Sequence, residues 1–178
     1  MGAITLDRVI FDIIPDTQAD SPRHGETLGI MVCWHRRYVL GDPHAYPTPQ
    51  VFAAAIPQDE IIALPMYLFD HSGLSLSTSS ERFRACDSAA WDWGQVGYIY
   101  VRRADVRRAY GVTRISRRVR TRVLDVLRGE VDVYDQYLRG DVYAYSLTDR
   151  QTGALLDSCG NFFGENPQTN GMGEHYVQ

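Results

Sequence analysis

The sequence predicts an α+β fold: a single domain over residues 1–178 with a mostly antiparallel sheet of about five to seven strands, one long Arg-rich amphipathic helix and one or two short helices. Size and composition are the first observation, since 178 residues with 44% hydrophobic and 22% charged side chains suit one core of ordinary size. The second is the apolar period, which is near two over most of the chain and helical in one long segment. The third is the order of the segments, because strands that do not alternate regularly with helices favour antiparallel pairing.

Several segments have the alternation and the β-branched or aromatic content of strands, and they lie at residues 4–14, 28–40, 61–69, 74–78, 94–101, 142–148 and 154–163. The first two are compatible with a hairpin, and the last two are joined by D-R-Q-T-G, which is a hairpin signal. Residues 15–27 and 41–50 are rich in turn-forming residues and are expected to be loops. The segment 164–178 is expected to be a loosely ordered tail.

The helices are expected in three places. Residues 50–56 predict a short helix, and another begins near Asp105 and is closed by Gly111, a residue suited to the left-handed conformation at a helix end. The long helix follows from apolar side chains that recur every three or four positions over 115–138, with arginines on the opposite faces. Gly129 interrupts this stripe and indicates either one helix weakened by about 1 kcal/mol or two helices that meet there.

All 18 basic residues are arginines, and ten of them fall within residues 102–128 beside only two aspartates. That segment carries a net charge of +8, whereas the whole chain carries −4. The absence of lysine has two interpretations. One is the coding bias of a high-GC genome, and the other is functional, because guanidinium groups bind phosphates and carboxylates through paired hydrogen bonds. Arg117, Arg118 and Arg122 form the candidate partner face. The chain as a whole is acidic, which is not typical of a nonspecific nucleic-acid binder. A solvated helix face that pairs with the acidic remainder of the chain, or an acidic protein partner, is therefore at least as well supported as nucleic acid. The exposed helix is also compatible with a homodimer.

The three cysteines, Cys33, Cys86 and Cys159, are expected to be reduced thiols, because an odd number at wide spacing suits neither a disulfide framework nor a zinc ribbon. The spacing Cys33-x-His35 is not repeated, and no Walker loop is present in the sequence, so no metal and no cofactor are assigned. The sequence has no signal-peptide pattern and no apolar run near the roughly 20 residues of a membrane span. We therefore expect a cytoplasmic protein without membrane contact.

Asp70, His71 and Ser72 stand side by side where a buried strand is expected to end. They are not a catalytic triad, because successive side chains of an extended chain point to opposite faces. One interpretation is a turn in which Asp70 caps backbone amides and His71 packs under a loop. The other is functional, with His71 as a ligand-facing donor or general base.

A second polar group includes Asp92, Trp93 and Gln95, which precede a strand containing two glycines. Glycine within a strand marks a bulge or a close approach of another backbone or a ligand. If this strand lies beside the one that ends at Asp70, then Asp70, His71, Asp92 and Gln95 converge. These four residues with Trp93 are the candidate ligand site, and the alternative is that the tryptophans belong to the core and the aspartates cap loops.

The motifs Y-L-F-D-H-S-G and W-D-W-G-Q-V-G-Y-I-Y, with further segments over roughly residues 28–171, resemble a widespread family of small uncharacterised bacteriophage and mobile-element proteins. Members of that family read W-D-S-G-Q-V-G, whereas Trp93 stands in place of the serine here. A serine nucleophile is therefore not expected at this position.

The resemblance implies an accessory protein that acts in the host-cell cytoplasm. The expected function is a non-enzymatic counter-defence inhibitor that binds stoichiometrically, of the anti-CRISPR, anti-restriction or nucleotide-signal-sequestering kind. Its partner would be a host defence protein or a nucleotide signal molecule. The alternative is a small hydrolase or nuclease that uses His71 with Asp70 and Asp92.

Overall fold

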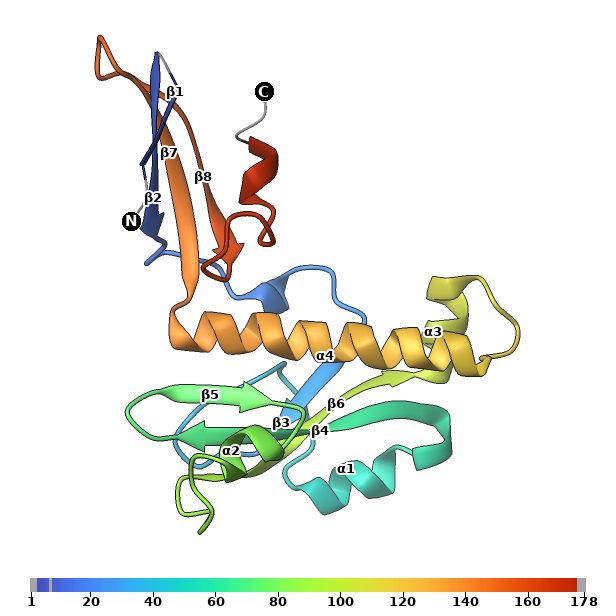
Figure 1. Cartoon of the computed structure of the whole chain (residues 1–178). Coiled ribbons are helices and arrows are strands. Elements are labelled where there is room, and N and C mark those ends of the chain that lie inside the picture. The colour runs from blue at the N-terminus through green and yellow to red at the C-terminus, as the bar shows by residue number, and fades with distance from the viewer. Residues whose placement is uncertain (1–2, 7, 176–178) are drawn as a thin grey trace. The chain divides into compact units, whose positions relative to one another are not determined.

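A computed structural model describes residues 3–6 and 8–175, and its mixture of helices and antiparallel strands confirms the α+β class (Figure 1). The sequence predicts one sheet, whereas the strands form two sheets of four strands each. The chain divides into two compact units, which we call unit 1 (1–22 and 136–178) and unit 2 (23–135). Compact units of this kind can still unfold together, so the single domain stays a prediction.

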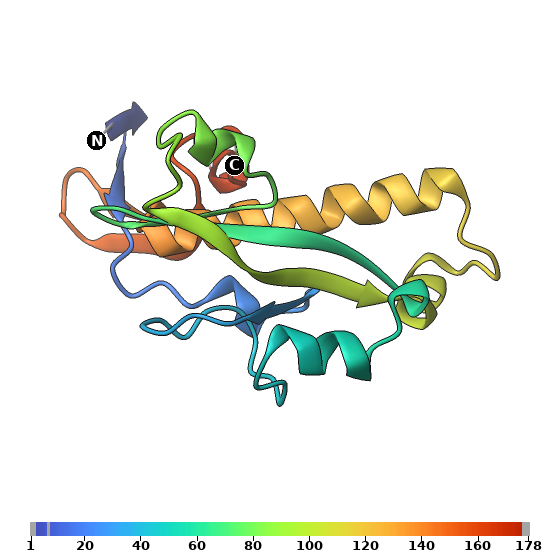
Figure 2. The same ribbon diagram turned by 90° about the horizontal axis from the view of Figure 1, so that it is seen from below.

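Unit 2 contains the sheet that carries the candidate site. Its strand order is β3 (Ile30–Cys33), β6 (Trp93–Arg102), β4 (Ile61–Asp70) and β5 (Leu74–Ser77), and every neighbouring pair is antiparallel. Figure 2 shows the two long strands, β4 and β6, side by side along their length. The predicted segments 61–69, 74–78 and 94–101 therefore form strands close to their expected bounds.

Helices cover both faces of this sheet. The helix α1 (Pro49–Ala55) places Phe52 in a cluster with Val32, Ile61 and Tyr100, and Thr48 caps its first turn. On the other face, α4 (Arg117–Arg139) buries an apolar stripe that approaches Ile99, formed by Val123, Leu127 and Val131. The other helices are short: η1 (Pro22–His24), η2 (Gln58–Glu60), α2 (Glu81–Arg84) and α3 (Arg103–Tyr110).

Glycines end both Arg-rich helices. Gly111 follows α3 with φ +61°, and Gly140 follows α4 with φ +72°, a backbone region that glycine adopts without the strain of a Cβ atom. Gly129 does not divide the long helix, since α4 is continuous through it. Of the two alternatives left open by the sequence, the structure therefore has the single helix.

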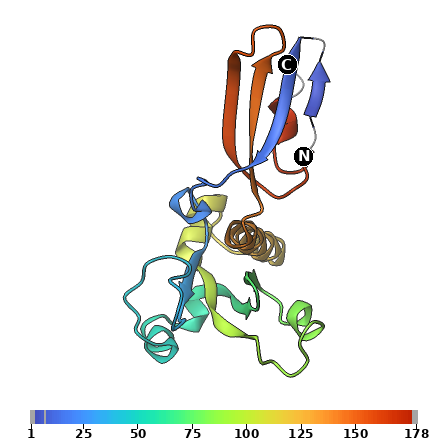
Figure 3. The ribbon, with the colours of Figure 1, turned by 90° about the vertical axis from the view of Figure 1, so that its left-hand side faces the viewer.

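Unit 1 contains the other sheet, in the order β1 (Ala3–Leu6), β2 (Val9–Pro15), β7 (Val142–Asp149) and β8 (Leu155–Phe163), as Figure 3 shows. The hairpin predicted between the last two strands is confirmed. The hairpin with which segments 4–14 and 28–40 were compatible does not form. The first segment folds into β1 and β2, and β2 pairs with β7 from the far end of the sequence, while the second segment supplies β3 to the sheet of unit 2.

The segment expected to be a loose tail packs against the sheet of unit 1. Met172, in the short helix η3 (Met172–His175), is fully buried with Phe11, Tyr145 and Phe162. The apolar side chain of Met172 gives this glycine-rich segment its anchor, and only 176–178 of the expected tail lie outside the described residues.

Over residues 3–6 and 8–175, no helix combines the length and the apolar character that crossing a membrane requires.

Candidate functional site

The pairing of β4 with β6 brings the two polar groups of the sequence together. Phe69 stands opposite Trp93 in this antiparallel ladder, and just beyond it the N–H of Asp70 donates to the carbonyl of Asp92 at 2.7 Å. The strands are thus neighbours, as the candidate site required. Asp70 and Asp92 lie at the same end of the sheet although they are far apart in the sequence.

Each of the two aspartates has a basic or polar partner. The carboxylate of Asp70 pairs with the guanidinium of Arg37 and also accepts a hydrogen bond of 3.3 Å from the hydroxyl of Tyr38. The Oδ2 atom of Asp92 lies 3.0 Å from Nδ1 of His71. Asp70 therefore bonds to side chains and does not have the capping role of the turn interpretation, and His71, with 66% of its side chain exposed, does not pack under a loop.

Asp87 shapes the loop that leads into β6. Its carboxylate accepts hydrogen bonds from the backbone N–H groups of Ala89, Trp91 and Asp92 at 3.0, 2.7 and 3.0 Å. These bonds, the one from Asp92 first, hold the pKa of Asp87 below its usual range, although partial desolvation opposes the shift. The carbonyl of Asp87 also accepts from Nε1 of Trp93 at 2.8 Å. Asp87 is thus the aspartate that caps a loop.

The tryptophans of this loop are not part of the core. The side chain of Trp91 is 86% exposed, and Trp93 is partly buried with its ring edge near Tyr67. With Trp34 they line a cavity of about 270 Å³, to which Asp70 and Asp92 contribute carboxylates. We call this cavity the aromatic pocket, and its remaining polar walls come from His35, Arg37 and Gln95.

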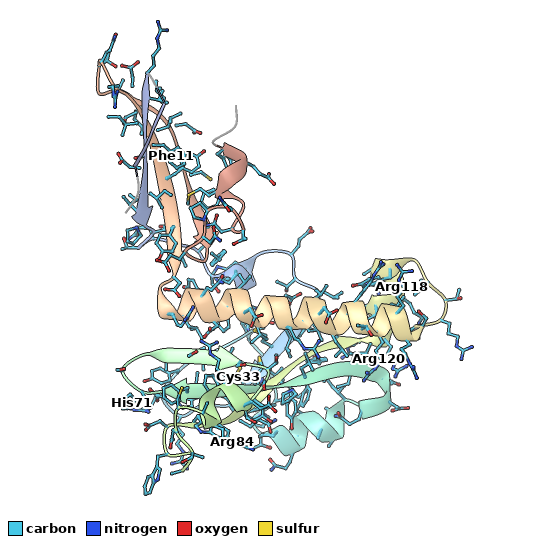
Figure 4. All side chains as sticks on the ribbon, viewed as in Figure 1. Phe11, Cys33, His71, Arg84, Arg118 and Arg120 are labelled. Atoms are coloured by element: carbon cyan, nitrogen blue, oxygen red, sulfur yellow. The ribbon has the colours of Figure 1, made fainter. Side chains whose placement is uncertain are left out.

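His71 stands beside the aromatic pocket and is not one of its lining residues. Its ring is tilted against that of Phe69 at 6.0 Å, and the pairing with Asp92 links it to the pocket wall. Figure 4 shows His71 at the end of unit 2 where β4 turns into β5. The structure therefore gathers Asp70, Asp92, Trp93 and Gln95 into one cavity and places His71 at its margin.

The segment after β3 supplies pocket residues that the sequence analysis did not select. Trp34, His35 and Arg37 line the cavity, and the rings of His35 and Tyr38 stack with centroids 4.9 Å apart. Arg37 lies over the Tyr38 ring at 5.4 Å and is 68% exposed. The run W-H-R-R-Y directly after a buried strand was the available signal, because it concentrates rings and donors at a strand end.

The candidate partner face lies elsewhere on unit 2. Arg117, Arg118 and Arg122 are exposed in the first turns of α4, and no ion pair involves them in the part of the chain that the structure describes. Figure 4 shows Arg118 and Arg120 at the start of α4, next to α3 and away from His71. These arginines and the aromatic pocket are therefore separate features.

The thiol of Cys33 is unsuited to chemistry at neutral pH. The residue is buried, and desolvation, followed by the charge of Asp42, raises the pKa of the thiol to about 12. Cys86 and Cys159 are exposed free thiols. Within residues 3–6 and 8–175, no three His, Cys, Asp or Glu side chains are grouped so as to hold a metal ion.

A comparison of the chain with protein-family models, with curated proteins and with solved structures finds no match.

Proposed function

We propose that this chain is a non-enzymatic binding protein of a phage or mobile element, which inhibits a host defence system by sequestering a nucleotide signal in the aromatic pocket. The observation that carries the proposal is the composition of that pocket, which combines three tryptophans with two carboxylates and one guanidinium. Stoichiometric binding requires only such a surface, without a bond-breaking step.

The pocket has the groups that a nucleotide needs. The exposed ring of Trp91 and the partly buried ring of Trp93 offer faces on which a base stacks, an interaction worth about 1–3 kcal/mol per base. The carboxylates of Asp70 and Asp92 accept hydrogen bonds from the amino and imino groups of a base edge. Arg37, which is 68% exposed, supplies donors for a phosphate at the open side.

Tryptophan fluorescence tests the proposal directly. Titration with purine and pyrimidine mono-, di- and cyclic nucleotides is expected to change the emission, because a stacked base quenches the exposed Trp91. Trp91→Ala is expected to weaken binding at least 10-fold, measured by calorimetry. Val126→Ala, at an exposed site on α4, is the control and should bind as the parent does. If no nucleotide binds, or if Trp91→Ala binds as the parent does, the aromatic pocket is not a nucleotide site.

The setting of the proposal rests on the resemblance of the chain to phage and mobile-element proteins. Proteins of that kind act in the host-cell cytoplasm, and several kinds of counter-defence work by occupying a target. An anti-CRISPR or anti-restriction version would use the arginines of α4 against an acidic defence protein. In that version, changing Arg117 and Arg118 together to Glu should weaken the complex in a salt-dependent manner, and an unchanged complex would exclude this face.

A hydrolase or nuclease is the second candidate, and the contact between His71 and Asp92 favours it. A carboxylate 3.0 Å from Nδ1 orients an imidazole and leaves Nε2 free to accept a proton from water or a hydroxyl. In this reading His71 is the general base, Asp92 its positioning residue, and Asp70 holds Arg37 for the substrate's phosphate.

Substitution of His71 separates the two functions. His71→Ala should lower turnover of a nucleotide or nucleic acid by 100-fold or more if His71 is the base. It should change the affinity of a binding protein by no more than about 1–3 kcal/mol. Nucleotides are incubated with the parent protein and then analysed by chromatography. Intact nucleotides together with measurable binding favour sequestration. Hydrolysed products that are absent with His71→Ala favour the enzyme.

A further inference from the structure

A second cavity lies at the opposite end of the sheet of unit 2. The register of β4 and β6 pairs Ile61 with Arg102, which places η2 beside the start of α3. The cavity between them has a volume of about 350 Å³, and we call it the arginine cavity. Its lining consists of Asp59, Glu60, Arg102, Arg103, Ala104 and Arg107.

The arginine cavity contains unused hydrogen-bond donors. No side-chain hydrogen bond or ion pair of Arg102, Arg103 or Arg107 occurs in the described part of the chain, and Nε of Arg103 is buried from solvent without an acceptor. Arg108, one residue from Arg107, differs from them because it pairs with Asp105 at 3.2 Å.

The backbone adds further donors at the same place. Arg102 is the N-cap of α3, its side chain does not cap the helix, and the first turn of a helix has N–H groups without intrahelical acceptors. The aligned peptide dipoles add positive potential there. Asp59 and Glu60 line the same cavity as the three arginines, so the lining retains a formal charge of +1.

We propose that the arginine cavity binds the phosphate group of an organic phosphate ester. Arg102, Arg103 and Arg107, which all line the cavity, donate to the phosphate oxygens through their guanidinium groups. Asp59 and Glu60 accept hydrogen bonds from hydroxyl or amino groups beside the phosphate, which favours a sugar phosphate or nucleotide over inorganic phosphate.

This site is independent of the aromatic pocket. The two cavities lie at opposite ends of the ten-residue strands β4 and β6, a separation of roughly 30 Å at about 3.3 Å per residue. Figure 4 likewise shows Arg118 and Arg120 at the end of unit 2 away from His71. A single mononucleotide cannot occupy both cavities.

Calorimetry on the 178-residue chain at low salt tests the proposal with three probes: inorganic phosphate, ribose 5-phosphate and a 5′-phosphorylated oligonucleotide. Arg107→Ala is the test variant, because Arg107 is exposed and its substitution leaves the core intact. Arg108→Ala is the matched control on the same helix. At least 10-fold weaker binding is expected for Arg107→Ala and less than a 2-fold change for Arg108→Ala.

The probes identify the source of the phosphate. Tighter binding of ribose 5-phosphate than of inorganic phosphate supports a free ester as the ligand, and binding of the oligonucleotide alone, with the same dependence on Arg107, supports a nucleic-acid end. The proposal is overturned if no probe binds, or if Arg107→Ala and Arg108→Ala behave alike. Trp91→Ala should leave this binding unchanged, which separates the result from the function proposed for the aromatic pocket.

Discussion

Gly97 lies where β6 passes closest to β3. A Cβ atom built on Gly97 falls far inside contact distance of the Val32 carbonyl oxygen and 2.9 Å from the Cα atom of Cys33, so the backbone itself would have to move. Gly97 follows an irregularity in the β4–β6 ladder, where Met66 pairs with Gly97 and Tyr67 with Gln95. This irregularity, at which β6 has one residue more than β4, sets the register that brings Asp92 to the end of β4.

We predict that Gly97→Ala lowers the free energy of unfolding by roughly 3 kcal/mol, because a methyl group forced against backbone produces strain that side-chain rotation cannot relieve. Gly94→Ala is the matched control on the same strand, since a Cβ atom at Gly94 meets no atom within 4 Å. Its effect should stay within about 0.5 kcal/mol. Urea denaturation measures both, and equal effects would show that the close approach does not constrain β6.

The thiols should differ sharply in reactivity. The pKa of Cys33 is raised to about 12 by burial, so the thiolate that reacts with iodoacetamide is scarce at pH 8, whereas Cys86 and Cys159 are exposed. Intact mass spectrometry should therefore find two adducts on the native protein and three in denaturant. Rapid labelling of Cys33 in the native protein would contradict its burial.

At the scale of single residues, the sequence predicted site residues where polar side chains stand at the end of a predicted strand. Asp70, Asp92 and Gln95 could be selected because each lies at the end of an apolar run, and an antiparallel pairing brings such ends together. Arg37 was not selected, although the run W-H-R-R-Y after a buried strand was a signal for it. Its pairing with Asp70 depends on the path of a loop after β3, which no periodicity encodes.

Among the elements, α4 is the one whose stability is open to a simple test. Gly129 is exposed within the helix and a Cβ atom there meets nothing within 4 Å, so Gly129→Ala should raise the free energy of unfolding by about 0.5–1 kcal/mol. Gly140→Ala should have the opposite sign, because φ at Gly140 is +72°. Thermal unfolding followed by circular dichroism compares the two, and a loss of stability in Gly129→Ala would contradict an unstrained helix at that position.

The elements were predictable to different degrees for physical reasons. The helix α4 was predictable because an apolar stripe over six turns repeats the same signal, and the hairpin of β7 and β8 because its turn residues are local. The pairing of β2 with β7 was not, since it joins segments separated by more than a hundred residues. The helix α2 has only four residues, too few to show a helical period.

At the scale of the whole molecule, the question is whether the two compact units unfold as one domain. The boundary at residues 135 and 136 falls inside α4, a helix without interruption, and helix formation is cooperative. All three tryptophans, Trp34, Trp91 and Trp93, belong to unit 2. Tryptophan fluorescence therefore follows the unfolding of unit 2 alone. A substitution in unit 1 changes the midpoint of this fluorescence transition only if the two units unfold together.

Met172→Ala is that substitution. Met172 is fully buried in the core of unit 1, so the truncation should cost about 2–5 kcal/mol there. If the chain is a single domain, as its length and composition predict, the tryptophan transition in urea shifts to lower concentration together with the transition in far-UV circular dichroism. If the units are independent, circular dichroism shows an earlier transition of unit 1 and the tryptophan midpoint stays where it was. Exposed Leu155, also in unit 1, provides the control, since Leu155→Ala should move neither transition.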